Sequence, residues 1–288
     1  MINLGLVAAI ITVFCFTFGD VIAKRVSVDL GNRRTALYIV GAGVIPLIAA
    51  FIVLQPQFTI TIALISVAGG FFLAAGYPLV YKSLETEQAT NTWVLLNLPA
   101  AVVVLIGIFA LKEQISVIES FAVIAIFFGV LLVTVTKKME FNSKLLPAVA
   151  GNLCWATFFA IMIFEINSYN ASPVGIFFLA RGFGFLWLLA YYKLFTKKTE
   201  KKDRVKEKAV KMSNKLLGVV SGIFDGVGQT AFAFIIFYNF VALGGAITAT
   251  EPALVLILSY FVYKERVTIM QFIGLMVSVI GAVALSVL

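Results

Sequence analysis

The chain has 288 residues, of which 61% are hydrophobic and only 12% are charged. A water-soluble domain carries about a quarter charged residues, so the composition excludes a soluble protein and predicts an integral membrane protein. The formal net charge is +8. Most of the basic residues lie in short segments between apolar runs, which is typical of orientation in a membrane and argues against nucleic acid as a partner.

Several kinds of chemistry lack the residues that they need. The sequence has no histidine, and its two cysteines, Cys15 and Cys154, each lie inside an apolar run. Neither histidine-based catalysis nor a disulfide framework is therefore expected. There is no Gly-rich Lys-Ser/Thr phosphate loop and no cluster of metal ligands. We predict a protein that is not an enzyme, needs no cofactor or metal, and is not driven directly by ATP.

Ten apolar runs have about the twenty residues that a helix needs to cross a bilayer. In chain order they cover residues 4–22, 35–54, 60–81, 89–111, 117–136, 145–166, 173–195, 216–240, 243–263 and 267–287. The first run has no basic leader and no small-residue cleavage site, so we predict a retained helix rather than a signal peptide. The charged segment 196–214 is expected to be a solvated linker.

The basic residues predict an orientation. All of the 22 Lys and Arg residues except Lys112 and Arg181 follow odd-numbered runs or border the 196–214 segment. Because basic loops stay in the cytoplasm, we expect a multi-pass protein of the cytoplasmic membrane with the 196–214 loop inside and both termini outside.

The two halves of the sequence resemble each other. The segment 109–117, FALKEQISV, matches 261–269, FVYKERVTI, which lies 152 residues further on. Four other pairs keep the same spacing: Gly70 with Gly222, Phe72 with Phe224, Gly76 with Gly228, and Gly129 with Gly281. Pro99 and Pro252 also correspond, with a spacing that is one residue longer. We predict two repeats, 1–140 and 141–288. Since five spans is an odd number, the repeats are inverted, as in many alternating-access transporters.

The paired Lys-Glu turns, together with 14–20 (FCFTFGD) and 154–159 (CWATFF) in the first helix of each half, resemble the drug/metabolite transporter superfamily in its EamA branch. The resemblance covers the whole chain and implies an all-α fold of ten helices in two inverted five-helix repeats. The chain departs from the family where Phe16 or Phe18 replaces a tryptophan and where the loop 55–58 lacks basic residues. The family's usual cytoplasmic termini therefore stay open as the alternative topology.

Three charged residues lie deep inside predicted spans, where an isolated charge is costly. Asp225 is about 15 Å deep in the eighth span, and Glu251 and Arg181 are each about 12 Å deep in the ninth and seventh. One hypothesis makes Asp225 or Glu251 a proton-coupling or cation-binding carboxylate, with Gln229 on the same helix face as Asp225. The other pairs Arg181 with Glu251 in a structural salt bridge. We expect Asp225 to have no basic partner.

Further residues complete the predicted site. Pro99 and Pro252 free a backbone carbonyl and are candidate hinges, and Asn97 precedes Pro99 as Thr250 and Glu251 precede Pro252. Aromatic side chains with a polar tip are candidates for lining a pocket: Trp93, Trp155, Tyr77 and Tyr238. Asp20 and Glu165 lie at predicted helix ends and are expected to reach the interface. The glycines of the third and eighth spans are expected to allow close helix packing.

We therefore predict a secondary active transporter that moves a small organic metabolite, such as an amino acid, an amine or a drug-like solute, by alternating access. Proton coupling and facilitated export both stay open. The expected partners are the substrate, membrane lipid, protons and, as an option, a second copy of the chain. Two alternatives also stay open: a non-transporting scaffold or sensor with sealed carboxylates, and a lipid or polyprenyl-phosphate translocator using Arg33 and Arg34.

Overall fold

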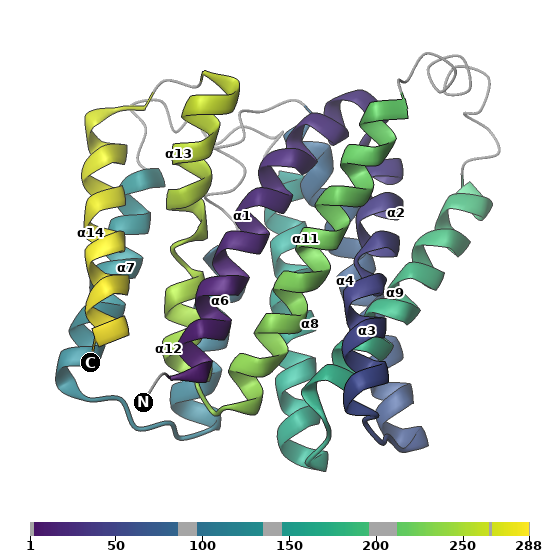
Figure 1. The fold of residues 1–288 in the computed structure, drawn as a ribbon, viewed down its shortest axis with the longest axis horizontal. Helices are drawn as coiled ribbons and strands as arrows, with labels where there is room; N and C mark the ends of the chain where they lie inside the picture. The colour runs from purple at the N-terminus through teal and green to yellow at the C-terminus, as the bar shows by residue number, and fades with distance from the viewer. Residues whose placement is uncertain (1–2, 86–96, 135–145, 196–211, 265–266, 288) are drawn as a thin grey trace.

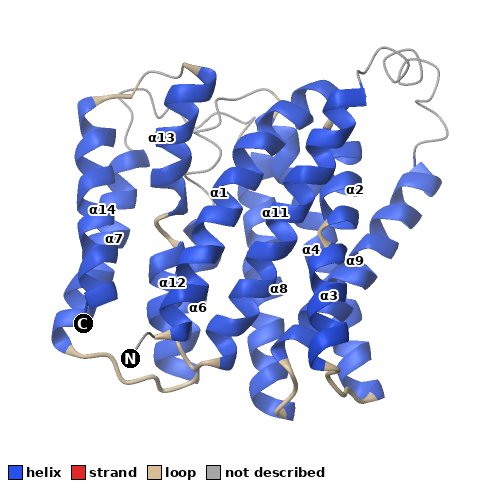
Figure 2. Cartoon of the chain, viewed as in Figure 1, coloured by secondary structure: helices blue, strands red, loops and turns tan. Residues whose placement is uncertain are grey.

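The computed structural model describes residues 3–85, 97–134, 146–195, 212–264 and 267–287, and within these ranges all regular elements are helices (Figure 1, Figure 2). The first half contains α1 (Leu4–Leu30), α2 (Asn32–Ala42), α3 (Val44–Leu54), α4 (Ile60–Leu84), α6 (Asn97–Leu105), a π-helical turn η2 (Ile106–Ala110) and α7 (Val117–Thr134). The second half contains α8 (Leu146–Tyr169), α9 (Pro173–Phe195), α11 (Met212–Phe237), α12 (Val241–Thr248), α13 (Glu251–Tyr263) and α14 (Ile269–Val287).

Each of the ten predicted spans contains helical structure within the described residues, whereas positions 89–96 of the fourth span and 135–136 of the fifth lie outside them. Within the described residues, seven helices or helix pairs are long and apolar enough to cross a membrane. Shorter apolar helices, Pro99–Ala110, Val117–Gly129 and Ile269–Leu285, account for the fourth, fifth and tenth predicted spans. The predicted class, an all-α membrane protein, is confirmed. Boundaries moved most in α1, which continues eight residues beyond the predicted end at Ile22.

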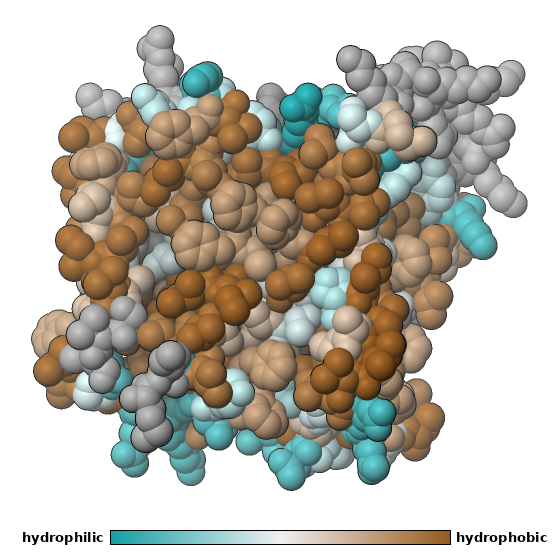
Figure 3. Space-filling view, in the orientation of Figure 1, coloured by the Kyte–Doolittle hydropathy of each residue, from teal (hydrophilic) through white to brown (hydrophobic). Residues whose placement is uncertain are grey.

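The outer surface is the one expected of a protein solvated by lipid. Large apolar side chains such as Val53, Phe109 and Ile60 are more than 70% exposed. In the space-filling view, hydrophobic residues cover the flank of the molecule, and hydrophilic residues gather at its upper and lower edges (Figure 3). Exposing this much apolar surface to water would be strongly unfavourable, whereas in hydrocarbon it costs little.

Helix packing relates the two halves by an approximate two-fold symmetry. The first span α1 packs along α11, the eighth, and the sixth span α8 packs in the equivalent way along α4, the third. The fifth and tenth spans, α7 and α14, pack on each other. At their crossing, an added Cβ on Gly129 would overlap the backbone of Ser278, and one on Gly281 would lie 2.8 Å from Ile126. Ser278 and Ile126 are equivalent positions of the repeat, because they also lie 152 residues apart. The two glycines therefore allow the same close approach of α7 and α14.

The two Lys-Glu turns also adopt the same backbone conformation. Lys112 (φ 56°) and Lys264 (φ 57°) both lie in the left-handed region, where few residues other than glycine are found. Each ends a helix and redirects the chain into the next span, so the sequence repeat corresponds to a repeated turn.

Two spans are interrupted within their length. The second breaks at Gly43, between α2 and α3, and the ninth breaks at Ala249–Thr250, between α12 and α13. Breaks inside transmembrane helices place helix ends and free carbonyl groups in the interior, where they can bind polar side chains or ligands. Both breaks border the polar centre of the molecule.

Both chain termini lie at one edge of the bundle, and the end of α9 and the start of α11 lie at the opposite edge (Figure 1). An even number of crossings places the two termini on the same side, and the connection after the seventh span lies on the other side. Which edge faces the cytoplasm remains the prediction made from the basic residues.

Candidate functional site

A cavity lies between the two halves, with about 80 Å³ open to the centres of water molecules. This is room for several waters, since one water needs about 10–15 Å³ on the same measure. The lining comes from the first, third and fourth spans of each half: Phe16, Asp20, Leu73, Tyr77, Pro99, Ala100, Val103, Trp155, Phe158, Phe159, Asp225, Gln229, Phe232, Thr248 and Glu251. The cavity thus lies on the approximate symmetry axis.

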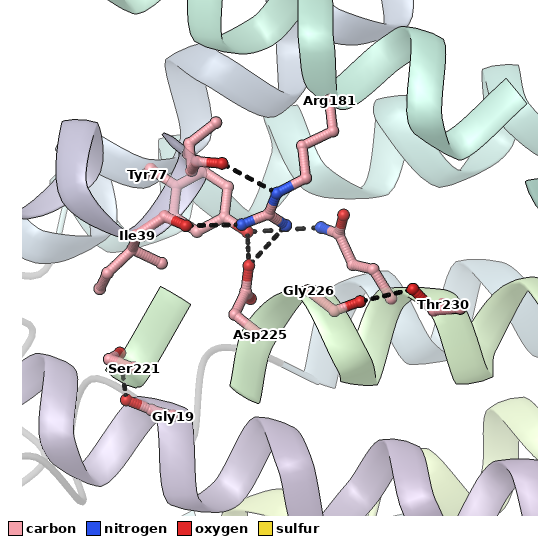
Figure 4. Close-up of polar contacts among 10 residues, drawn as sticks. Gly19, Ile39, Tyr77, Arg181, Ser221, Asp225, Gly226 and Thr230 are labelled. Carbon is pink, nitrogen blue, oxygen red and sulfur yellow. Dashed lines mark hydrogen bonds and ion pairs between the residues drawn. The ribbon is translucent and has the colours of Figure 1, made fainter. Parts of the chain in front are cut away.

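Asp225 at the cavity wall is paired with Arg181, not left alone. Arg181 Nη1 lies 2.6 Å from Asp225 Oδ2 (Figure 4). Arg181 is fully buried, and the Asp225 side chain is 13% exposed. The expectation that Asp225 lacks a basic partner was therefore wrong, as was the alternative pairing of Arg181 with Glu251. Span depth alone did not reveal which of two carboxylates at similar depth faces α9.

The break at Gly43 makes room for the arginine. Arg181 Nη2 donates to the carbonyl of Ile39 at 2.8 Å, and Nε donates to the carbonyl of Val40 at 3.1 Å. An added Cβ at Gly43 would overlap the guanidinium. Carbonyls next to a helix break and an opposing carboxylate together compensate for the desolvation of the buried guanidinium. The Arg181–Asp225 pair is therefore a neutral unit, with Asp225 in the cavity lining and Arg181 buried behind it.

Tyr77 and Gln229 extend this unit along the cavity. The Tyr77 hydroxyl donates to Asp225 Oδ2 at 2.7 Å, and Gln229 Nε2 donates to the Tyr77 hydroxyl at 3.3 Å. The guanidinium also lies over the Tyr77 ring, 5.9 Å from its centroid. The prediction that Gln229 shares a face with Asp225 is met through the intervening tyrosine, which comes from the other half of the chain.

Asp20 and Glu251 form a second acidic pair in the cavity. Their carboxyl groups both line the cavity and lie within hydrogen-bonding reach of each other. Glu251 is the first residue of α13, directly after the break in the ninth span, where the helix N-terminus favours a negative charge. Two fully ionised carboxylates cannot hydrogen-bond, because each is only an acceptor. A hydrogen bond between them is therefore formed when one proton is shared between the two groups.

Sequence reasoning missed Asp20. The first span was expected to end at Ile22, which placed Asp20 near the interface, whereas α1 runs on to Leu30 and puts Asp20 in its interior. The helix passes through Lys24 and Arg25, whose long side chains can reach outward. The sequence did indicate a longer helix, because the first strong helix breaker after Asp20 is Gly31. Glu165 was misplaced similarly; it is fully buried, and Ser66 donates to it at 3.3 Å.

Two polar atoms of the cavity-lining residues have no hydrogen-bond partner within the part of the chain that the structure describes. These are the indole nitrogen of Trp155, a donor, and Oε1 of Gln229, an acceptor, and both atoms are buried. Such groups are costly unless something pairs with them. Aromatic rings form the rest of the wall, with Phe159 and Phe232 4.8 Å apart and Tyr77 and Trp155 5.0 Å apart between centroids. The cavity thus combines apolar walls with unpaired polar groups.

Some of the remaining predicted site residues line the cavity and others lie away from it. Pro99 lines the cavity in the first turn of α6, and Pro252 is buried in the first turn of α13. Asn97 begins α6, and only its backbone is described. Trp93 lies outside the described residues. Tyr238 is 41% exposed and stacks on Phe234, so it is not a cavity residue.

Glu113 of the first Lys-Glu turn has a structural role. Its carboxylate accepts from the backbone amides of Val241 at 2.9 Å and Ala242 at 2.6 Å. These are the first residues of α12, so Glu113 caps a helix in the opposite half. An anion at a helix N-terminus satisfies unpaired amides and interacts favourably with the helix dipole. The turn motif that carried the family resemblance thus joins the two halves.

Comparison with known proteins agrees with this architecture. The EamA-like transporter family matches residues 3–135 and 142–287. A curated relative, the "Uncharacterized transporter YxxF" of Bacillus subtilis (strain 168), is 25% identical over 131 residues, which is 44% of this chain and 41% of the relative. The chain thus covers less than half of that relative. A protein with a solved crystal structure is 14% identical, with a TM-score of 0.68. The match covers 97% of this chain and 95% of that protein, and it supports the fold alone.

Proposed function

The chain belongs to the EamA-like transporter family, and we propose that it is a secondary transporter that moves a small organic metabolite across the cytoplasmic membrane by alternating access. The observation that carries the proposal is the cavity, which is lined by equivalent spans from both inverted halves. Rocking of two such halves about a shared site exposes it to each side of the membrane in turn.

The lining favours a solute with a basic group and an apolar part. Asp20 and Glu251 offer carboxyl groups to the cavity, and Phe16, Phe159 and Phe232 offer apolar surface. The single buried cation among the described spans, Arg181, already binds Asp225 and two carbonyls. An organic phosphate would need several free cationic donors, so an amine or an amino acid is the better match.

The alternative of a scaffold or sensor required both acids to be paired and sealed. Asp225 is paired with Arg181, but Asp225 and Glu251 both line the cavity. The alternative of a lipid translocator relied on Arg33 and Arg34. Arg33, at the start of α2, lies with its guanidinium 5.3 Å from the ring centroid of Tyr191 on α9. The transporter proposal accounts for the cavity at the symmetry axis, which neither alternative needs.

The test is uptake by proteoliposomes of a panel of labelled amines, amino acids and neutral metabolites, with and without an imposed pH gradient. We expect at least one amine-bearing solute to accumulate, and Glu251→Gln to reduce its initial rate by tenfold or more. The matched control is Glu119→Gln, which removes a carboxylate from the surface end of α7. Absence of protein-dependent uptake for every amine-bearing solute would refute the proposal. The gradient dependence separates proton coupling from facilitated export.

A further inference from the structure

We propose that Asp20 and Glu251 form an exchange site in which one ammonium group of an organic cation replaces one shared proton. The inference rests on the proposed transport function and adds to it a ligand class and a stoichiometry. It starts from two carboxyl groups that line one cavity, Asp20 on α1 of the first half and Glu251 on α13 of the second, two helices that pack against each other.

The charge on the site limits what can bind. The Arg181–Asp225 unit is neutral, so the charge facing the cavity depends on Asp20 and Glu251. With one shared proton, the acidic pair carries a single negative charge. If that proton leaves for water and a monovalent ammonium enters, two carboxylates and one cation again give a single negative charge. The exchange therefore leaves the buried charge unchanged, which avoids the high cost of changing net charge in a low-dielectric interior.

The hydrogen-bonding groups also match an ammonium. A primary ammonium has three N–H donors, and the cavity offers three kinds of acceptor: Asp20, Glu251 and Oε1 of Gln229. Gln229 is only 3% exposed, and its Oε1 has no hydrogen-bond partner among the described residues. An unpaired buried acceptor is satisfied by a donor from a ligand. This orphaned oxygen is independent of the acidic pair and points to the same ligand.

Other charged and titratable groups surround the pair. On α1 these are Cys15 and Lys24, on α4 Tyr77 and Tyr81, on α9 Arg181, and on α11 Asp225. Lys24 donates to the carbonyl of Leu84 at 2.7 Å, one turn beyond Asp20. Asp225 accepts from Tyr77 and pairs with Arg181. The shared proton of Asp20 and Glu251 is thus the one that an incoming cation displaces most directly.

Proton counting tests the proposal without requiring transport. Binding of benzylammonium to the purified protein is measured by titration calorimetry in two buffers with different ionisation enthalpies, over a series of pH values. We expect the release to reach a maximum of about one proton per ammonium bound. Benzyl alcohol has the same ring without the charge and should release none. Benzyltrimethylammonium, which has no N–H donor, should bind about tenfold or more weakly, because it cannot make charge-assisted hydrogen bonds.

Variants assign the proton. Asp20→Asn and Glu251→Gln should each abolish the release, because one carboxyl group alone has no proton to share with its partner. Glu165→Gln is the matched control: it removes a buried carboxyl group outside the cavity lining and should leave one proton released. Wild-type binding without proton release at any pH would overturn the proposal, as would undetectable benzylammonium binding or full release in both cavity variants.

The outcome is separable from that of the uptake assay. If solutes are transported but ammonium binding releases no proton, the exchange site is wrong and the transporter proposal stands. If ammonium binding releases a proton but no solute crosses the membrane, the site stands and the transport proposal fails. For an exchange of one monovalent cation for one proton, uptake should also follow the pH gradient and be insensitive to membrane potential, because no net charge moves.

Discussion

Arg181 Nη1 lies 2.6 Å from Asp225 Oδ2 and joins α9 to α11 at the centre of the second half. The position equivalent to Asp225 in the first half is Leu73, an apolar residue that lines the same cavity. The two repeats thus share helix packing but differ in the polarity of their centres. An inverted pair with this asymmetry has one polar wall, which gives a bound solute a preferred orientation.

Removal of the arginine should destabilise the protein more than removal of the whole ion pair. Arg181→Met leaves Asp225 buried without its counter-charge, and breaking a buried pair from one side costs about 3–5 kcal/mol. The double variant Arg181→Met/Asp225→Leu copies the leucine of the first half and should recover most of that loss. Thermal unfolding in detergent, analysed as a double-mutant cycle, measures the difference. Equal unfolding midpoints for Arg181→Met and wild type would contradict a supporting role for the pair.

Gly43→Ala should be strongly destabilising, because the added Cβ would overlap the Arg181 guanidinium where it contacts the carbonyl groups of Ile39 and Val40. The arginine would have to leave its site, with a loss of about 2 kcal/mol or more, as for other disrupted buried polar networks. The matched control is Gly182→Ala, whose Cβ would have nothing within 4 Å. In a helix this control should be neutral or stabilising by up to about 1 kcal/mol. Thermal unfolding of both variants checks the prediction; similar midpoints would argue against the tight fit at Gly43.

Glu113→Gln should loosen the start of α12. The carboxylate receives hydrogen bonds from Val241 and Ala242, and loss of a charged cap costs about 1 kcal/mol. Hydrogen exchange followed by mass spectrometry should show faster exchange in the peptide that begins at Val241. Glu119→Gln is the control, since Glu119 accepts from the backbone amide of Ser116, directly before its own helix. Its effect should stay near the start of α7, and faster exchange at Val241 in this control would undermine the assignment.

Trp155→Phe should impair binding without lowering stability. The indole nitrogen has no protein partner, so its removal deletes an unsatisfied buried donor and keeps the aromatic wall beside Tyr77. For solutes with a carbonyl or carboxylate acceptor we expect uptake affinity to fall by about tenfold, which corresponds to about 1.4 kcal/mol. Solutes without an acceptor should be unaffected. Competition uptake with matched pairs of solutes distinguishes these results, and a uniform loss for both kinds would point to altered packing instead.

Accessibility labelling should establish the orientation. Ser213 is exposed at the start of α11, and Gln55 is exposed at the turn between α3 and α4, which joins the second and third spans. With Cys15 and Cys154 replaced by alanine, a cysteine at position 213 should react with a membrane-impermeant maleimide only from the cytoplasmic side. A cysteine at position 55 should react only from outside. The reverse pattern would place both termini in the cytoplasm and overturn the orientation predicted from the basic residues.

The sequence predicted the fold well because lipid imposes a simple rule. A span in hydrocarbon must satisfy its backbone internally and present apolar side chains, so ten apolar runs can be recognised without knowledge of their packing. The spacing of 152 residues between the Lys-Glu turns then indicated the repeat, which appears in the structure as matched left-handed Lys112 and Lys264. The division at residues 140 and 141 and the roles of the site residues remain predictions.

Only the tertiary structure decided which buried charges meet. Depth along a helix is set by sequence position, but the direction in which a side chain points depends on packing and on where each helix ends. Asp20 became a cavity residue because α1 continues to Leu30, and Arg181 pairs with Asp225 because the break at Gly43 leaves space for the guanidinium. The sequence alone determined that charges are scarce and therefore need partners, and packing of spans distant in sequence selected those partners.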